Sequence, residues 1–157
     1  MSDLVLRDTI QDDLQAFYRH QLDPEANRMA AFTAKDPADL DAFTARWGRI
    51  LDDDSVNETI LLDGEVVGHV LTYGPADELE ITYWIAPEHW GRGIASRAVT
   101  EFLTRHPARP LFARVAKDNL GSLQVLQKCG FSVYGEDSGF SPSRGETVEE
   151  FHLKLTS

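Results

Sequence analysis

Two glycines flank an arginine at Gly91-Arg92-Gly93, where an apolar run ends and a helical pattern begins. Glycine permits tight turns and lets a ligand approach the backbone closely. The first N–H groups of a helix are unpaired and carry partial positive charge, which suits a phosphate or pyrophosphate. Arg97 adds a second positive side chain nearby. The triplet therefore predicts an anion-binding turn at the start of a helix.

Two other nucleotide-binding patterns do not fit this stretch. A Walker loop ends in Gly-Lys-Ser or Gly-Lys-Thr, and the sequence has no such ending. A Rossmann fingerprint needs a third glycine where Ser96 stands, and an acid at the end of the next strand, which here reads LFARVA. We therefore exclude both.

The histidines and the cysteine do not form a metal-binding pattern. Zinc-like spacing and a nearby cysteine partner are missing for all five histidines, which are His20, His69, His89, His106 and His152. The lone cysteine, Cys129, falls on the apolar face of an expected helix and is interpreted as a core residue. We expect no metal. One cysteine cannot form an internal disulfide, which fits a reducing cytoplasm.

The elements around the glycines are typical of a β-α-β unit. LEITYWIA at 79–86 is an expected strand, the apolar period becomes helical over 92–105, and LFARVA at 111–116 is a strand again. Because such crossovers join parallel strands, 79–86 and 111–116 should lie side by side in parallel.

The remaining chain predicts helices and antiparallel strands. The first elements expected before the unit are a strand at 4–6, a helix from a cap at Asp8 or Thr9 to about His20, and a segment of loop and broken helix at 22–37. They are followed by a helix from Pro37 to the aspartates at 52–54, and by strands at 59–62 and 65–73 joined by an Asp63-Gly64 turn. Those expected after it are a helix capped by Asp118 or Asn119 and closed by Gly130, and strands at 131–134 and 148–155 joined by a loop with Gly139, Pro142 and Gly145.

The stretch EITYWIAPEHWGRGIASRAV resembles the pyrophosphate-binding motif of the GNAT superfamily of acyl-CoA-dependent N-acyltransferases, particularly its RimJ/RimL-like branch. Gly91, Gly93 and Ala95 supply the small positions, and Trp90 replaces the usual arginine or glutamine. The stretch ARVAKDNLGSLQVLQKCGF, about 25 residues downstream, resembles the second family signature. The positions that agree there are Asn119, Ser122, Val125, Leu126, Lys128, Gly130 and Phe131.

The resemblance implies one domain over 1–157 with the GNAT fold, of the α+β (mixed α/β) class. About seven strands would form a mostly antiparallel mixed sheet flanked by helices, with strands 79–86 and 111–116 splayed apart. It also implies acetyl-CoA as the acyl donor, its pantetheine arm pairing with a free strand edge as an added strand would. The residues assigned to the cofactor are Trp84, Ile85, Ala86, Trp90, Gly91, Arg92, Gly93, Ile94, Ala95, Ser96, Asn119 and Ser122.

Transfer of an acetyl group from a thioester to an amine needs a base, because an alkylamine has a pKa of about 10. We expect Glu80 to be that base, since it lies on the strand that carries the cofactor. Strand alternation places Glu78 on the same face, as the second choice. The other interpretation of Glu80 is a sheet-surface glutamate without a catalytic role.

The leaving thiolate needs an acid, which many family members supply as a tyrosine in the helix after the fifth strand. This sequence has no tyrosine between Asp118 and Gly130. Ser122 is therefore our first choice, and its other interpretation is a bond to a first-turn amide of its own helix. Tyr134 is our second choice. No protein nucleophile is needed, because the amine attacks the thioester directly.

The net charge of −11 is unevenly distributed: residues 1–80 contain 18 acids and 6 bases, and residues 81–157 contain 8 acids and 9 bases. This distribution argues against nucleic-acid binding, which requires a basic face. It suits a protein that binds anionic CoA with its C-terminal half and a cationic acceptor near its N-terminal half; alternatively the acids serve solubility. We expect no signal peptide and no membrane helix.

These observations predict a cytoplasmic acetyl-CoA-dependent N-acetyltransferase that acts on a primary amine. A cationic acceptor such as a polyamine, an aminoglycoside-like drug or a basic peptide is expected, and family members are often homodimers. Two alternatives stay open: a catalytically degenerate acyl-CoA-binding sensor or interaction module, and an acetyltransferase for protein N-termini.

Overall fold

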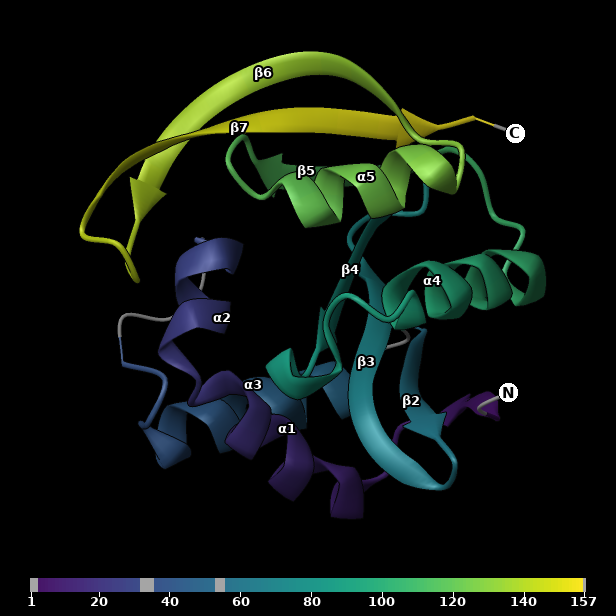
Figure 1. The fold of residues 1–157 in the computed structure, drawn as a ribbon, viewed down its shortest axis with the longest axis vertical. Helices are drawn as coiled ribbons and strands as arrows, with labels where there is room; N and C mark the ends of the chain where they lie inside the picture. The colour runs from purple at the N-terminus through teal and green to yellow at the C-terminus, as the bar shows by residue number, and fades with distance from the viewer. Residues whose placement is uncertain (1–2, 32–35, 53–55, 157) are drawn as a thin grey trace.

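The computed structural model describes residues 3–31, 36–52 and 56–156. Seven strands form one mixed sheet in the order β1-β2-β3-β4-β5-β7-β6 (Figure 1). The strands are β1 (Leu4–Asp8), β2 (Asn57–Leu62), β3 (Glu65–Tyr73), β4 (Glu80–Ile85), β5 (Leu111–Ala116), β6 (Ser132–Ser141) and β7 (Glu146–Leu155). The helices are η1 (Gln11–Asp13), α1 (Leu14–Gln21), α2 (Pro24–Ala30), α3 (Leu40–Asp52), η2 (Pro87–His89), α4 (Ile94–Arg105) and α5 (Leu120–Lys128). In the described ranges, no helix is long and apolar enough to cross a membrane.

The parallel pair, β4 and β5, is joined at its beginning alone. Glu80 is paired with Phe112, and the Phe112 amide donates to the Leu79 carbonyl at 2.9 Å. On their outer sides, β4 pairs with β3 and β5 pairs with β7 along their whole lengths. The two strands therefore open into a wedge toward their C-terminal ends, and Figure 1 shows β5 and β7 turned away from β4. The expected mixed sheet with one parallel pair is confirmed.

Helices cover both faces of the sheet. Helices α4 and α5 pack on one face over the largest buried cluster, in which Phe102 and Leu153 have no exposed surface. Helices α1 and α3 pack on the other face, where Phe17 and Trp47 lie against Leu71 of β3. Helix α2 reaches the ends of β5 and β7 through a small apolar cluster. The wedge thus opens between two separately packed layers of helix.

Several expected elements are confirmed closely. Strands β3 and β5 have the expected bounds, and Asp63 and Gly64 turn with positive φ angles of 51° and 85°. Helix α5 has Asn119 as its N-cap, and Gly130 follows it with φ 103°. Helix α3 begins at Leu40 rather than at Pro37, and the expected aspartate turn at 53–54 lies outside the described residues.

Two expectations are wrong. Neither Asp8 nor Thr9 caps a helix, because β1 continues to Asp8 and the short turn η1 precedes α1. Gly139 lies within β6 rather than in a loop, since β6 pairs with β7 as far as Ser141. Both errors underestimate strand length, because polar residues with pairing partners in the tertiary structure were taken as loop.

The Asp13 carboxylate joins β1, η1 and β2. It is 3% exposed and accepts hydrogen bonds from the Arg7 guanidinium at 2.7 and 2.8 Å, the Ile10 amide at 2.9 Å and the Thr59 hydroxyl at 2.7 Å. Burial opposes the charge, but Arg7 and the other donors outweigh it and lower the pKa of Asp13 below its ordinary value. The carboxylate therefore stabilises the folded state when ionised.

We expect Asp13→Asn to lower the free energy of unfolding by about 2 kcal/mol at pH 7, because it leaves buried donors poorly matched. Since the folded-state pKa is lowered, the wild-type advantage is complete above about pH 4 and shrinks as the pH falls further. Urea unfolding at pH 7 and pH 3 measures this, with Asp12→Asn on the exposed neighbour as the control. An equal loss at both pH values would contradict the ion-pair argument.

Candidate functional site

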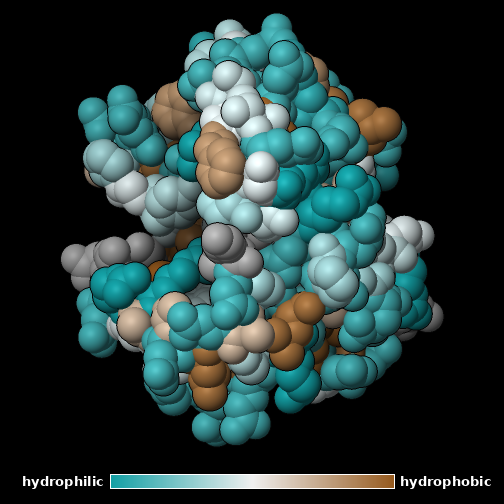
Figure 2. Space-filling view, turned by 90° about the vertical axis from the view of Figure 1, so that its left-hand side faces the viewer, coloured by the Kyte–Doolittle hydropathy of each residue, from teal (hydrophilic) through white to brown (hydrophobic). Residues whose placement is uncertain are grey.

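Two hollows meet at β4. The α4 groove, about 690 Å³, lies between the β4–α4 turn, α5 and α2, and the α3 cavity, about 720 Å³, lies between the sheet and the helices α1, α2 and α3. Ala30, Tyr83 and Trp84 line both hollows. Figure 2 shows a hydrophilic surface with scattered hydrophobic residues and a deep notch between its upper and lower parts. The two hollows thus share one wall at the wedge.

The turn before α4 has the geometry that an anion site needs. Gly91 has φ 76°, and Gly93, the N-cap of α4, has φ 75°. A Cβ on either residue would meet no other atom within 4 Å. The left-handed backbone, rather than crowding, therefore favours glycine, and the space above the turn is open to the first N–H groups of α4.

Most of the residues expected at the cofactor line the α4 groove. These are Trp84, Ile85, Trp90, Gly91, Gly93, Ile94, Ala95, Ser96, Asn119 and Ser122. Arg92 does not line it and contacts His89 Nδ1 at 3.2 Å on the surface. Ala86 does not line it either, because it is fully buried and its amide donates to the Val67 carbonyl of β3 at 2.9 Å.

The backbone N–H and C=O groups of the odd-numbered residues of β4 form its open edge. The Leu79 carbonyl points to β5 and the Ala86 amide points to β3, so alternation directs the backbone groups of Tyr83 and Ile85 into the wedge. Among the described residues, β5 pairs with β4 at Glu80 alone. The Ile85 carbonyl accepts a hydrogen bond from Trp90 Nε1 at 2.8 Å, which ties the turn to this edge.

Two hydroxyls meet where the hollows join. The oxygens of Tyr83 and Ser122 lie 2.8 Å apart, which is hydrogen-bond distance. Burial raises the pKa of Tyr83 to about 12, so the phenol is protonated at neutral pH. Sequence reasoning missed Tyr83; its place on the strand that carries the cofactor was the available signal. The pair can pass a proton toward either hollow.

Asn119 has a structural role at the other end of the groove. Its side-chain oxygen accepts from the Ser122 amide at 3.2 Å, and its side-chain nitrogen donates to the Met29 carbonyl at 3.2 Å. These bonds cap α5 and join it to α2. Direct contact between Asn119 and a cofactor stays a prediction.

A charged cluster lies along the α3 cavity. Glu80 Oε1 accepts from Arg114 Nε at 2.6 Å, and an Arg114 terminal nitrogen lies 4.0 Å from Glu150 Oε1. Glu150 is 5% exposed, and its Oε2 has no partner among the described residues. Sequence reasoning missed Glu150, which comes to the cavity because β7 lies beside β5. Glu78 lies in the turn before β4 and lines neither hollow.

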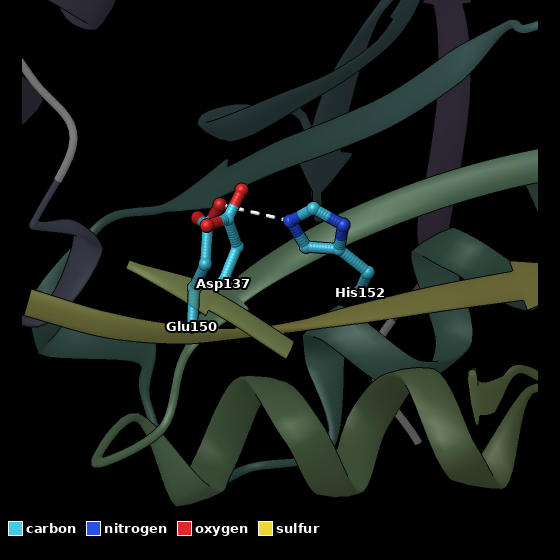
Figure 3. A group of neighbouring side chains, drawn as sticks. All are labelled: Asp137, Glu150 and His152. Carbon is cyan, nitrogen blue, oxygen red and sulfur yellow. Dashed lines mark hydrogen bonds and ion pairs between the residues drawn. The ribbon is translucent and has the colours of Figure 1, made fainter. Parts of the chain in front are cut away.

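Asp137, Glu150 and His152 form a compact group at the same place (Figure 3), with one possible ligand atom from each within 4.8 Å of the others. His152 Nε2 already contacts Glu150 Oε1 at 2.9 Å. The Arg114 guanidinium, 4.0 Å from the same oxygen, would repel a divalent cation. The charges therefore favour an ion-pair network, and absence of a metal stays our prediction.

Tyr134 is not brought to this site. Its ring is half exposed on β6, lies 6.0 Å from the Phe112 ring and has Lys154 Nζ 5.3 Å from its centre. It lines neither hollow. Ser122, our first choice for the acid, is therefore the one of the two that lies at the wedge.

Residues 3–132 match the family described as acetyltransferase (GNAT) domain. Since this match covers most of the 157 residues, the chain belongs to the GNAT acetyltransferase family. Comparison with curated proteins gave no match.

Solved structures with this fold include three acetyltransferase relatives of low sequence identity. Spermidine N-acetyltransferase from Vibrio cholerae, in complex with CoA and spermine, has 18% identity and a TM-score of 0.80, covering 98% of this chain and 95% of that one. Ribosomal-protein-alanine N-acetyltransferase from Brucella melitensis has 17% identity and a TM-score of 0.82, covering 98% and 99%. Mycobacterium smegmatis RimJ, in complex with CoA-disulfide, has 22% identity and a TM-score of 0.77, covering 98% and 82%. The expected GNAT fold is confirmed.

Proposed function

We propose that this protein is an acetyl-CoA-dependent N-acetyltransferase that moves the acetyl group to a primary amine within a ternary complex. The observation that carries the proposal is the wedge between β4 and β5, which joins the α4 groove to the α3 cavity at Tyr83. The family membership and the CoA bound to two structural neighbours support the choice of cofactor. Measurement of CoA release with a panel of amines tests it directly.

The α4 groove is proposed to bind CoA. The amides at the start of α4 would meet the pyrophosphate, and the open backbone edge at Tyr83 and Ile85 would pair with the pantetheine amides. Acetyl-CoA would supply the activated thioester, and the residues of this chain would orient it. Trp90, in the position that suggested a RimJ/RimL-like relative, holds the turn against β4 through Ile85.

The α3 cavity is proposed to bind the amine acceptor. A carboxylate there can remove the proton that the attacking amine must lose. Glu80 is the proposed base, and Glu150 is the alternative because its unpartnered Oε2 faces no competing hydrogen bond among the described residues. The Tyr83–Ser122 hydroxyl pair would then return a proton to the CoA sulfur.

We expect Gly93→Val to abolish the rise in melting temperature that acetyl-CoA causes, because a branched side chain would fill the open space above the turn. Gly145→Val is the matched control: its φ is +69° and its Cβ would also meet no neighbour, but it lies outside the groove. Both variants carry similar backbone strain, so thermal melts with and without ligand separate strain from binding. An intact shift in folded Gly93→Val would remove the pyrophosphate assignment.

We expect Glu80→Gln to lower turnover at pH 7 by about 100-fold while acetyl-CoA affinity changes little. The deficit should narrow as the pH rises toward about 10, where the amine is increasingly neutral without a base. Initial rates from pH 6.5 to 10 check this, with Glu78→Gln as the control outside both hollows. Wild-type rates in Glu80→Gln together with a loss in Glu150→Gln would assign the base to Glu150.

We expect Tyr83→Phe to lower kcat by roughly 10- to 100-fold with little change in the KM for acetyl-CoA, because the ring stays and the proton donor goes. Ser122→Ala should cause a loss of similar size if the two hydroxyls act in series. Tyr134→Phe is the control on the exposed surface. A normal kcat in both Tyr83→Phe and Ser122→Ala would show that water protonates the thiolate.

A further inference from the structure

The α3 cavity is lined by more positive than negative side chains. Arg46 and Arg49 of α3 and Arg114 of β5 line it, together with Glu80 and Glu150. Glu80 is the one acid from the acidic N-terminal half that lines this cavity, within the described residues. The overall charge of that half therefore does not predict the charge at the acceptor.

The two arginines of α3 have no acidic partner among the residues that the structure describes. Arg114 neutralises Glu80 at 2.6 Å and also lies near Glu150. Arg46 and Arg49, three residues apart on one side of α3, form no ion pair within residues 3–31, 36–52 and 56–156. Arg46 and Arg49 are both exposed residues of α3, and both line the α3 cavity. Two guanidiniums that line one cavity and are not paired with a carboxylate of the described residues offer a binding place for an anion.

Four residues that line the same cavity carry a buried polar atom with no hydrogen-bond partner among the described residues: Asn27 Oδ1, His69 Nδ1, Trp84 Nε1 and Glu150 Oε2. Burial, and then the nearby Arg46, lower the pKa of His69 to about 3, so its ring is neutral at physiological pH. Unpaired buried polar groups are uncommon in folded proteins, and their concentration in one cavity points to a polar ligand. Glu150 offers an acceptor suited to an ammonium group.

The apolar wall of the cavity lies between these polar groups. The His69 ring packs 4.6 Å from Phe17 and 5.0 Å from Trp47, both of which line the cavity. The cavity volume of about 720 Å³ is suited to a small molecule. A ligand in this cavity would contact carboxylates on the sheet, aromatic rings next to them, and guanidinium groups on α3.

We propose that the acceptor is a zwitterionic, amino-acid-like amine whose anionic group binds Arg46 and Arg49 of α3 while its amine faces Glu80 and Glu150. This rests on the proposed N-acetyltransferase function and specifies its substrate class. The anionic group is a carboxylate, or a phosphonate or phosphinate with the same charge and hydrogen-bond acceptors. A polyamine would place a second positive charge near Arg46 and Arg49, so it should be a poor acceptor.

The test compares acceptors that differ only in the anionic group. Phenylalanine is paired with phenethylamine, tryptophan with tryptamine, and aminopropylphosphonate with propylamine; spermidine is the member with several positive charges. CoA release gives kcat/KM for each with the whole protein. We expect at least one anionic member to exceed its partner by about 10-fold or more. Preference for spermidine, or equal values within every pair, would overturn the proposal.

Two variants locate the effect. We expect Arg46→Gln and Arg49→Gln to raise the KM for the preferred acceptor with an anionic group by about 10-fold while kcat/KM for its partner without that group changes little. Arg19→Gln is the matched control, because Arg19 lies on α1 and lines a different hollow. Unchanged selectivity in both α3 variants would also overturn the proposal.

Binding measurements distinguish a wrong substrate class from a wrong N-acetyltransferase assignment. Thermal melts with CoA and each acceptor are made alongside the kinetics. If CoA is bound but no amine is acetylated, the N-acetyltransferase proposal fails, and the inference still requires that anionic members raise the melting temperature more than their partners do. Equal shifts, or no shift with any member, would overturn it.

Discussion

The separation of β4 from β5 is the constraint on which the rest of the structure depends. Each strand is paired with an antiparallel neighbour on its outer side. The two strands can therefore stay in the sheet although they pair with each other only at Glu80 and Phe112. Buried backbone groups require partners, which makes an open strand edge inside a domain costly unless a ligand or a side chain completes it. Trp90 completes part of this edge at Ile85. The remaining edge is where an extended ligand can bind.

The wedge also brings together groups that the chain separates widely. Tyr83 reaches Ser122 of α5 because the strand lies beside the groove, and Glu150 reaches the α3 cavity because β7 pairs with β5. Burial raises the pKa of Tyr83 to about 12. In the α3 cavity, the Glu80 carboxylate forms an ion pair with the Arg114 guanidinium. A proton donor and proton acceptors thus lie on the two sides of one strand, as acyl transfer between two bound substrates requires.

The charge around the α3 cavity is given by the residues that line it, and not by the net charge of either half of the chain. The acids of the N-terminal half are distributed over the surface and over structural contacts such as Asp13 with Arg7. The α3 cavity instead takes Arg46 and Arg49 from that acidic half and Glu150 from the nearly neutral C-terminal half. A prediction from summed charge therefore favoured a cationic acceptor, whereas the lining residues favour an amine that also carries an anion.

The sequence by itself determined the β-α-β unit and the turn at Gly91 and Gly93, and it limited the cap of α5 to Asp118 or Asn119, of which the structure has Asn119. These features depend on periodicity, left-handed backbone and local hydrogen bonds, all of which act within a few residues. The Tyr83–Ser122 contact, the Glu150 oxygen that has no partner among the described residues, and the position of Arg46 and Arg49 beside Glu80 and Glu150 were decided by the tertiary structure alone. Each of these features depends on residues from different elements coming together. Which buried group finds a partner therefore depends on sheet order and helix packing rather than on spacing along the chain.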